Sequence, residues 1–185
     1  MNTTTKYELF KNVIDIPDHI SRYIRVESKK GDPIFNDVVD GSIGDGKRIQ
    51  SDFNCEIGRY FKRKLRSFIK NKGLEHHVIR DLVIVRSEPF CKRQKLHYDY
   101  DTDVLRKLQT KDYPHGLIVA VSDHSRFIVN GSGKNTTVHL NKGDVLVFRG
   151  DLLHAGAEYY NENIRLHAYI DSKKYMRDKN ITYIA

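Results

Sequence analysis

The chain has 185 residues, enough for one domain with a substantial core. Its 32 Lys and Arg residues outnumber its 24 Asp and Glu residues, which gives a net charge of +8. This excess is compatible with anionic partners, such as nucleic acid or an acidic co-substrate, and equally with an ordinary lysine-rich surface. No apolar run approaches the roughly 18 residues that a membrane span needs, so no membrane partner is expected.

The first residues, MNTTTKYELF, lack the apolar segment of a signal peptide. The two cysteines, Cys55 and Cys91, do not have the spacing of a metal site, and two cysteines do not make a disulfide framework. We therefore expect a soluble intracellular protein, either cytoplasmic or nuclear.

The first 75 residues predict helices and loops that support a later core. Residues 6–14 fit a short strand or a helical turn, and Pro17 is suited to opening a short helix. Residues 28–50 are rich in Gly, Asp and Lys, which predicts a long loop with a possible role as a lid. Residues 52–71 predict the best helix, which Gly73 ends. Its apolar side chains recur at three- and four-residue steps: Phe53, Ile57, Tyr60, Phe61, Leu65, Phe68 and Ile69.

After Gly73 the pattern changes to short runs of apolar and β-branched residues, which predict strands. The expected strands are 78–85, 95–100, 116–121, 125–129, 136–140, 144–148, 153–160 and 165–171. Regularly spaced short strands are typical of a sandwich or jelly roll. We expect a mainly β protein with one domain over residues 1–185, in which a jelly-roll core at about 76–175 carries the N-terminal helices on its outside.

Three residues have the spacing of a metal site. His97 and Asp99 lie two apart in a predicted strand, so both side chains point to the same face. His154 follows after four more predicted strands, enough for a jelly roll to wind back to the first pair. Two imidazoles and one carboxylate can occupy one face of an octahedral Fe(II) ion and leave three positions for substrates. A His-X-Asp tripeptide alone is common by chance; the order and context of all the parts make the combination rarer.

A basic residue completes the pattern. Arg165 lies eleven positions after His154 (165 − 154 = 11), in the next predicted strand. The planar guanidinium of Arg matches a carboxylate through two parallel hydrogen bonds and stays charged when partly buried. Gln94 and Arg86 lie near the expected entrance, where facing solvent is the simpler expectation.

Residues 83–171 resemble the Fe(II)- and 2-oxoglutarate-dependent dioxygenase superfamily, most closely its prolyl-hydroxylase-like and phytanoyl-hydroxylase-like branches. The segment CKRQKLHYDYD resembles the HXD strand of these enzymes, and GDVLVFRGDLLHAGAEYYNENIRLHAYID resembles their final strands. The resemblance implies a double-stranded β-helix, a cupin-like form of the jelly roll. It also implies that His97, Asp99 and His154 bind iron, and that Arg165 binds the distal carboxylate of 2-oxoglutarate. Many relatives have Ser where this chain has His167, which could donate to the co-substrate or simply pack on its strand.

The resemblance implies an oxidoreductase that uses O2 to hydroxylate or demethylate a substrate while 2-oxoglutarate is decarboxylated to succinate and CO2. A protein side chain or a small molecule is the favoured substrate. Nucleic acid ranks lower, because the segment after His154 lacks the longer Arg-rich motif of the base demethylases. The alternative is a non-catalytic, metal-binding cupin-like module, although such a module would not need Arg165.

Overall fold

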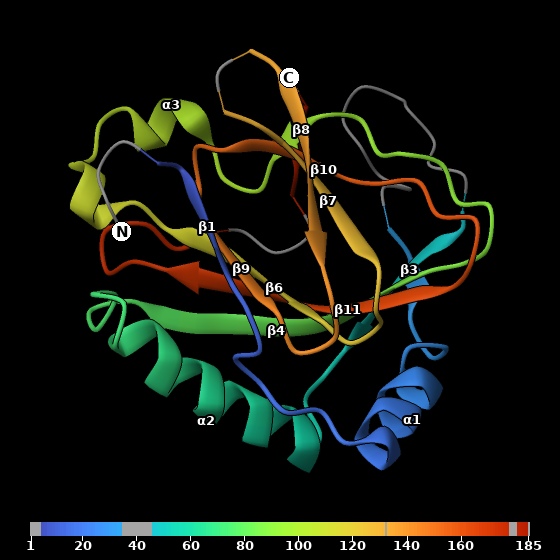
Figure 1. Ribbon diagram of the computed structural model, residues 1–185. Helices are drawn as coiled ribbons and strands as arrows, with labels where there is room; N and C mark the ends of the chain where they lie inside the picture. The colour runs from blue at the N-terminus through green and yellow to red at the C-terminus, as the bar shows by residue number, and fades with distance from the viewer. Residues whose placement is uncertain (1–4, 35–45, 132, 178–180, 185) are drawn as a thin grey trace.

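The computed structural model describes residues 5–34, 46–131, 133–177 and 181–184 (Figure 1). Within these ranges two β-sheets face each other, and every pairing between named strands is antiparallel. The large sheet has the order β1 (Tyr7–Phe10), β9 (Val145–Arg149), β6 (His115–Ala120), β11 (Asn163–Asp171), β4 (Val78–Ser87), β3 (Arg48–Asp52) and β2 (Asp32–Pro33). The small sheet has the order β12 (Tyr183–Ile184), β5 (His97–Tyr98), β10 (Leu153–Gly156), β7 (Ser125–Asn130) and β8 (Asn135–Leu140). This architecture confirms the predicted mainly β jelly roll.

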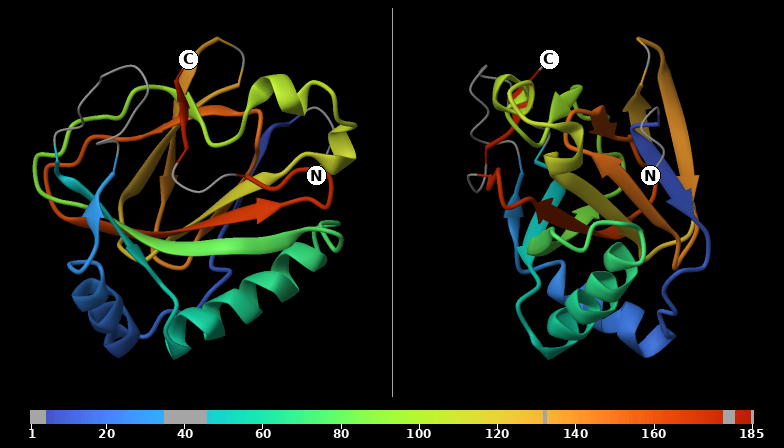
Figure 2. Two further views of the ribbon diagram at one scale, coloured as in Figure 1. Left: turned by 180° about the vertical axis from the view of Figure 1, so that it is seen from behind. Right: turned by 90° about the vertical axis from the view of Figure 1, so that its left-hand side faces the viewer.

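Two helices cover the outer face of the large sheet, α1 (Asp18–Glu27) and α2 (Glu56–Lys70), as both views of Figure 2 show. The helix predicted at 52–71 is confirmed; it begins after Cys55, whose Sγ accepts a hydrogen bond from Gly58 N. Leu65 and Ile69 of α2 are buried in the main hydrophobic core, and such a side chain contributes about 1.5–3 kcal/mol. Two short helical segments, α3 (Thr102–Leu105) and η1 (Thr110–Asp112), connect β5 to β6. No helix in the described ranges is long and apolar enough to cross a membrane.

The N-terminal region contributes more strands than the sequence predicts. The expected loop 28–50 contains β2 and the start of β3, because Arg48–Asp52 pairs with β4 and continues the large sheet. Residues 6–14 include the edge strand β1, which resolves the choice between strand and helical turn. Residues 35–45, the middle of the expected lid, lie outside the described residues.

Two strands near the site are shorter than expected. β5 includes only His97–Tyr98 of the predicted 95–100, and β10 ends at Gly156 although the prediction extends to residue 160. Each is limited by its partner: β5 pairs with two-residue β12, and β7 pairs with β10 only as far as Gly156. Short strands therefore present the site residues next to loops.

Strand β11 sets the two faces of the large sheet. Successive side chains of a strand point to opposite faces. Leu166 and Ala168 join the hydrophobic core under the helices. The alternate residues, Arg165, His167 and Tyr169, line a cavity between the two sheets. One strand thus supplies both the core and a polar inner wall.

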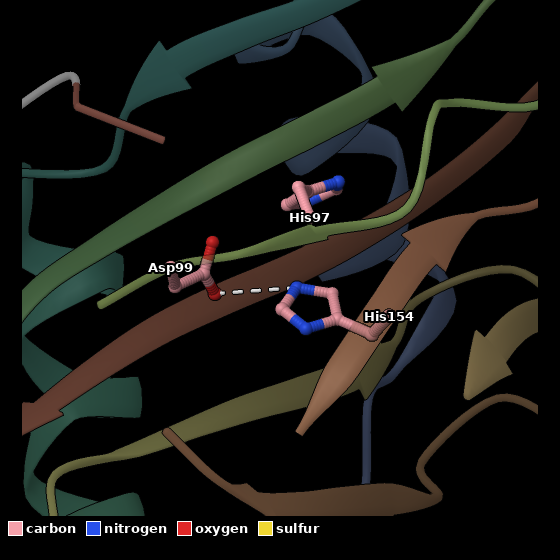
Figure 3. Close-up of side chains that lie close together, drawn as sticks. All are labelled: His97, Asp99 and His154. Carbon is pink, nitrogen blue, oxygen red and sulfur yellow. Dashed lines mark ion pairs between the residues drawn. The ribbon is translucent and has the colours of Figure 1, made fainter. Parts of the chain in front are cut away.

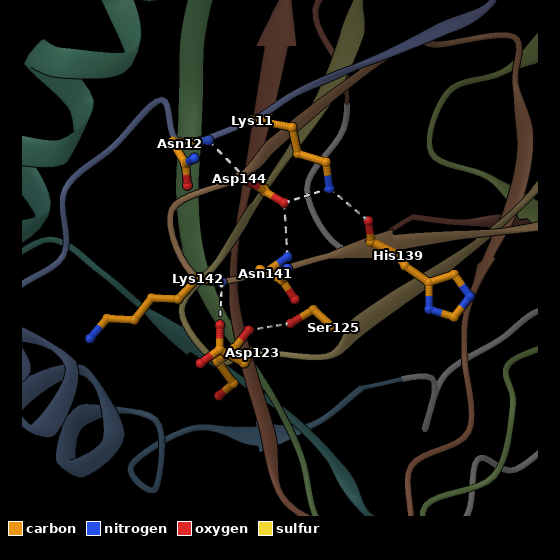
Figure 4. Close-up of polar contacts among 9 residues, drawn as sticks. Lys11, Asn12, Asp123, Ser125, His139, Asn141, Lys142 and Asp144 are labelled. Carbon is orange, nitrogen blue, oxygen red and sulfur yellow. Dashed lines mark hydrogen bonds and ion pairs between the residues drawn. The ribbon is translucent and has the colours of Figure 1, made fainter.

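The turn before β9 is fixed by a buried carboxylate, Asp144 (Figure 4). Its oxygens accept hydrogen bonds from Asn12 N at 2.9 Å, Asn141 N at 2.9 Å and Lys11 Nζ at 2.8 Å. Burial would raise the pKa of Asp144, but the hydrogen bonds from Lys11 and from the two backbone amides lower it. Gly143 precedes it with φ +86°, where a side chain would be strained. These contacts join β1 to the turn and fix the start of β9.

Candidate metal centre

His97, Asp99 and His154 meet between the two sheets (Figure 3). His97 and His154 are directly opposite each other on β5 and β10, and their ring centroids are 4.5 Å apart. Asp99 follows β5, and its Oδ2 lies 3.5 Å from His154 Nε2. One ligand atom from each residue lies within 4.8 Å of the other two, and all three side chains are buried. This arrangement could hold a metal ion.

Backbone carbonyls set the orientation of both imidazoles. His97 Nδ1 lies 2.8 Å from Lys95 O, and His154 Nδ1 lies 2.9 Å from Leu152 O. Because a carbonyl oxygen only accepts, we assign the proton to Nδ1 in each ring, which leaves the lone pair on Nε2. Burial, and then the neighbouring His154, lower the pKa of His97 to about 3. Neutral imidazoles with a hydrogen-bonded second nitrogen are the form that binds metals.

The carboxylate of Asp99 is the anionic member of the group. Burial alone would raise the pKa of Asp99, but the adjacent His154 and His167 hold it well below its usual range. His167 Nε2 lies 3.3 Å from Asp99 Oδ2, yet both atoms are buried without a hydrogen-bond partner among the described residues. A buried charge without a hydrogen bond is costly, and a divalent cation would satisfy the Asp99 oxygen. The donor set therefore fits Fe(II).

Two aromatic rings support the distal histidine. The ring of His154 is stacked on Phe127 with 5.1 Å between centroids, and lies 4.7 Å from the ring of Phe148. Both phenylalanines belong to a hydrophobic cluster of buried residues between the sheets. The apolar packing restricts the imidazole and keeps water away from one side of the centre.

Arg165 on β11 is buried in the same cavity. Its Nη1 donates to Ser87 Oγ at 3.0 Å, and no carboxylate in the described ranges forms an ion pair with it. Two other arginines do have such partners, since Arg86 binds Glu162 at 2.8 Å and Arg149 binds Asp151 at 2.6 Å. Burial lowers the pKa of Arg165, although a guanidinium remains charged in proteins. A buried cation of this kind calls for an anionic ligand.

The cavity has a volume of about 790 Å³, within the range of small-molecule sites. It contains every site residue predicted from the sequence: His97, Asp99, His154, Arg165 and His167. Gln94, which was expected to face solvent, also lines it, and its Oε1 accepts from Gly156 N at 2.7 Å. Arg86 does not line the cavity: it pairs with Ile164 on the face of the large sheet that packs on the helices, and it forms ion pairs with Glu88 and Glu162.

Sequence reasoning missed several residues of the cavity wall, among them Tyr169 and Arg177. Tyr169 follows His167 by two positions on β11, and the same alternation that pairs Arg165 with His167 could have identified it. Arg177 lies beyond the last predicted strand, where no pattern in the sequence assigns it to the site. Its position depends on the chain turning back over Tyr169.

No protein-family model matches the chain, and no curated protein matches it significantly in sequence. Solved structures do match its fold. The 2-oxoglutarate complex of the viral collagen prolyl hydroxylase vCPH from Paramecium bursaria Chlorella virus-1 is 19% identical, with a TM-score of 0.62; the match covers 91% of this chain and 96% of that chain. HygX from Streptomyces hygroscopicus, with nickel and 2-oxoglutarate bound, is 13% identical with a TM-score of 0.65, over 92% of this chain and 84% of that chain.

A third similar structure is SnoN, an α-ketoglutarate-dependent epimerase of nogalamycin biosynthesis. It is 13% identical with a TM-score of 0.68, and the match covers 91% of this chain and 79% of that chain. The chain therefore has the double-stranded β-helix fold of the Fe(II)- and 2-oxoglutarate-dependent oxygenases, as the resemblance in the sequence implied.

Proposed function

We propose that the protein is an Fe(II)- and 2-oxoglutarate-dependent dioxygenase with a single catalytic domain. The observation that carries this proposal is the buried group of His97, Asp99 and His154 in one cavity with Arg165, a buried cation that no described carboxylate pairs with. In this proposal O2 is the oxidant, and decarboxylation of 2-oxoglutarate to succinate and CO2 is coupled to hydroxylation or demethylation of a primary substrate.

His97, Asp99 and His154 would hold the Fe(II) ion, which supplies oxygen activation and an electrophilic centre for a keto acid. The carbonyls of Lys95 and Leu152 keep both histidine Nε2 atoms unprotonated. His167 lies 3.3 Å from the Asp99 carboxylate and would orient it rather than bind iron. A direct contact of His167 with 2-oxoglutarate is the alternative that the sequence leaves open.

Arg165 would bind the distal carboxylate of 2-oxoglutarate. Ser87 holds one side of the guanidinium, which keeps the remaining N–H groups available to a planar carboxylate. Val85, the β4 partner of Arg165, and Ile118 give the cavity an apolar wall that would hold the carbon chain of the co-substrate. A dry cavity also strengthens the attraction between the guanidinium and the carboxylate.

The presence of Arg165 favours an enzyme over a metal-binding module. A module that binds only a metal does not require a buried guanidinium without a carboxylate partner among the described residues. Among the substrates, a small molecule or a protein side chain is favoured over nucleic acid. Single-stranded nucleic acid needs a basic groove with aromatic rings on which bases stack. The described cavity instead includes the carboxylates of Asp32, Asp52 and Asp81 on its walls.

The test is an anaerobic titration of the metal-free protein with Fe(II) and then 2-oxoglutarate, followed through the visible charge-transfer band of the chelate. We expect the band to appear and to require both components. Iron binding without the band would leave a metal-binding cupin-like module, and failure to bind iron would contradict the proposal. The Arg165→Ala variant should need more 2-oxoglutarate for the same band while binding iron normally.

A further inference from the structure

The cavity extends beyond the metal centre along the inner face of the large sheet. Across β11 and β4, His167 pairs with Val83 and Tyr169 pairs with Asp81. Across β4 and β3, Val83 pairs with Asp52. Paired residues share a face of a sheet, so the two carboxylates stand on the inner wall next to His167 and Tyr169. Asp32 on β2 lines the same side of the cavity.

A second cation lies at this end of the cavity. The guanidinium of Arg177 is 3.6 Å from the centroid of the Tyr169 ring, and its Nη2 donates to Ile181 O at 3.2 Å. Tyr169 in turn lies 4.3 Å from the ring of His167. Arg177, Tyr169 and His167 are therefore in contact one after another, and His167 contacts the Asp99 carboxylate.

Arg177 resembles Arg165 and differs from Arg86 and Arg149. Its Nε is buried and has no hydrogen-bond acceptor among the described residues, and no described carboxylate forms an ion pair with it. By contrast, Arg86 and Arg149 have carboxylate partners at 2.8 Å and 2.6 Å. Arg177 lines the cavity, and a guanidinium without a carboxylate partner among the described residues is suited to bind an oxyanion there.

The two arginines reach the cavity from different positions along β11. Arg165 and Tyr169 are four residues apart on β11, or roughly 13 Å along the strand, and Arg177 stacks on Tyr169. The candidate metal ligands lie between these ends, because His167 contacts Asp99 midway. If Arg165 takes the co-substrate, Arg177 remains for the primary substrate.

We propose that the primary substrate is a small zwitterion, a free amino acid or a close analogue, whose carboxylate binds Arg177 and whose ammonium group binds Asp52 on the inner wall. This inference rests on the proposed oxygenase function. A dianion would be repelled by the aspartates, and a cation without a carboxylate would form no ion pair with Arg177. A zwitterion can form an ion pair with the arginine and with the aspartate at the same time.

The reaction would then be hydroxylation of a C–H bond of the amino acid. One atom of O2 enters the new C–OH group, and the other enters succinate. The two electrons that O2 needs beyond those of the C–H bond come from oxidative decarboxylation of 2-oxoglutarate, which releases CO2. The charged ends would fix the substrate in the cavity and place one carbon near the metal.

The test uses the full chain loaded with Ni(II), which replaces iron and does not turn over, and with 2-oxoglutarate. Free L-amino acids are titrated one at a time by calorimetry. The matched probes for each binder are its N-acetyl derivative, which lacks the ammonium group, and the corresponding amine, which lacks the carboxylate. We expect at least one amino acid to bind, and both derivatives to bind about tenfold to a hundredfold more weakly.

Variants separate recognition from folding. Arg177→Gln should weaken the amino acid about tenfold or more, but leave the amine unchanged, since the amine has no carboxylate to lose. Asp52→Asn should weaken binding of the amino acid and leave binding of the N-acetyl derivative unchanged. Lys30→Met is the matched control, because Lys30 lines the same cavity but already pairs with Glu27 at 2.6 Å. It should not change the affinity.

The same samples distinguish the two proposals. If the metal and 2-oxoglutarate do not bind to the wild type, the oxygenase function itself is wrong. If they bind but no amino acid does, or if Arg177→Gln binds the amino acid as well as the wild type does, the zwitterion proposal is overturned and the oxygenase function stands. Binding of a peptide or an oligonucleotide in place of every free amino acid would also overturn it.

Discussion

His97 and His154 are directly paired across antiparallel strands β5 and β10, with ring centroids 4.5 Å apart. Each imidazole is held by the carbonyl two residues before it, that of Lys95 for His97 and that of Leu152 for His154. Two histidines 57 positions apart in the sequence (154 − 97 = 57) therefore present the same nitrogen to one point. The pairing of two short strands builds most of the centre.

Replacing either paired histidine should remove metal binding without unfolding the protein. In His97→Ala and His154→Ala we expect Mn(II) affinity to fall by more than the roughly 10- to 100-fold that a supporting residue costs. The fold should remain, because neither ring belongs to the hydrophobic core clusters. Mn(II) titration by electron paramagnetic resonance and circular dichroism measure the two effects. His139→Ala, at an exposed histidine of β8, should bind Mn(II) as the wild type does.

Arg165→Met should weaken 2-oxoglutarate and leave the metal site intact. Loss of a charged hydrogen-bonded partner costs about 1.5–3 kcal/mol, so we expect affinity to fall about tenfold to a hundredfold. Ser87→Ala, which removes only the group that orients the guanidinium, should have a smaller effect. Calorimetry with Ni(II)-loaded protein gives both affinities. An unchanged 2-oxoglutarate affinity in Arg165→Met would show that the co-substrate binds elsewhere.

Acid should destabilise the metal-free protein partly through His115, a buried residue of β6. Burial, and then the neighbouring His77, lower the pKa of His115 to about 3, against an ordinary value near 6.5. Between pH 6.5 and pH 3 the imidazole of His115 is protonated in the unfolded state and neutral in the folded state. The stability that the neutral ring contributes is therefore present above pH 6.5 and lost as pH falls toward 3, by at most about 1.4 kcal/mol per pH unit.

The check is urea unfolding of wild type and His115→Gln between pH 4 and pH 7.5, both free of metal. The variant should show a shallower loss of stability with acid, because glutamine does not titrate. Equal slopes for the two proteins would mean that His115 does not contribute. The comparison removes the contributions of the other histidines, which are present in both proteins.

Asp144→Asn should destabilise the turn that precedes β9. The carboxylate accepts two backbone N–H groups and the Lys11 ammonium, and the amide can replace only part of this set. We expect a loss of about 1.5–3 kcal/mol and a decrease in Tm of several degrees. Asp123→Asn is the matched control, since Asp123 is exposed and accepts one backbone N–H, from Lys142 at 3.0 Å. Thermal unfolding that ranks the two variants equally would contradict this account.

Secondary structure can be predicted from the sequence where apolar residues recur at a regular spacing. The three- and four-residue steps of 52–71 predict α2, because one apolar stripe must face the sheet. Strands are harder to predict where they form only because a neighbouring strand offers backbone hydrogen bonds. Arg48–Asp52 has no strong strand pattern, yet it is a strand because β4 offers it an open edge.

The sequence by itself determined the jelly-roll class, the candidate ligands His97, Asp99 and His154, and the candidate co-substrate residue Arg165. Alternation along a strand and the order of motifs are properties of the chain, so they can be read without a structure. Only the tertiary structure decided which charges lack partners. Ion pairing depends on contacts between segments far apart in sequence, and this is why Arg86 binds Glu162 outside the cavity while Arg177 stacks on Tyr169 in the cavity wall.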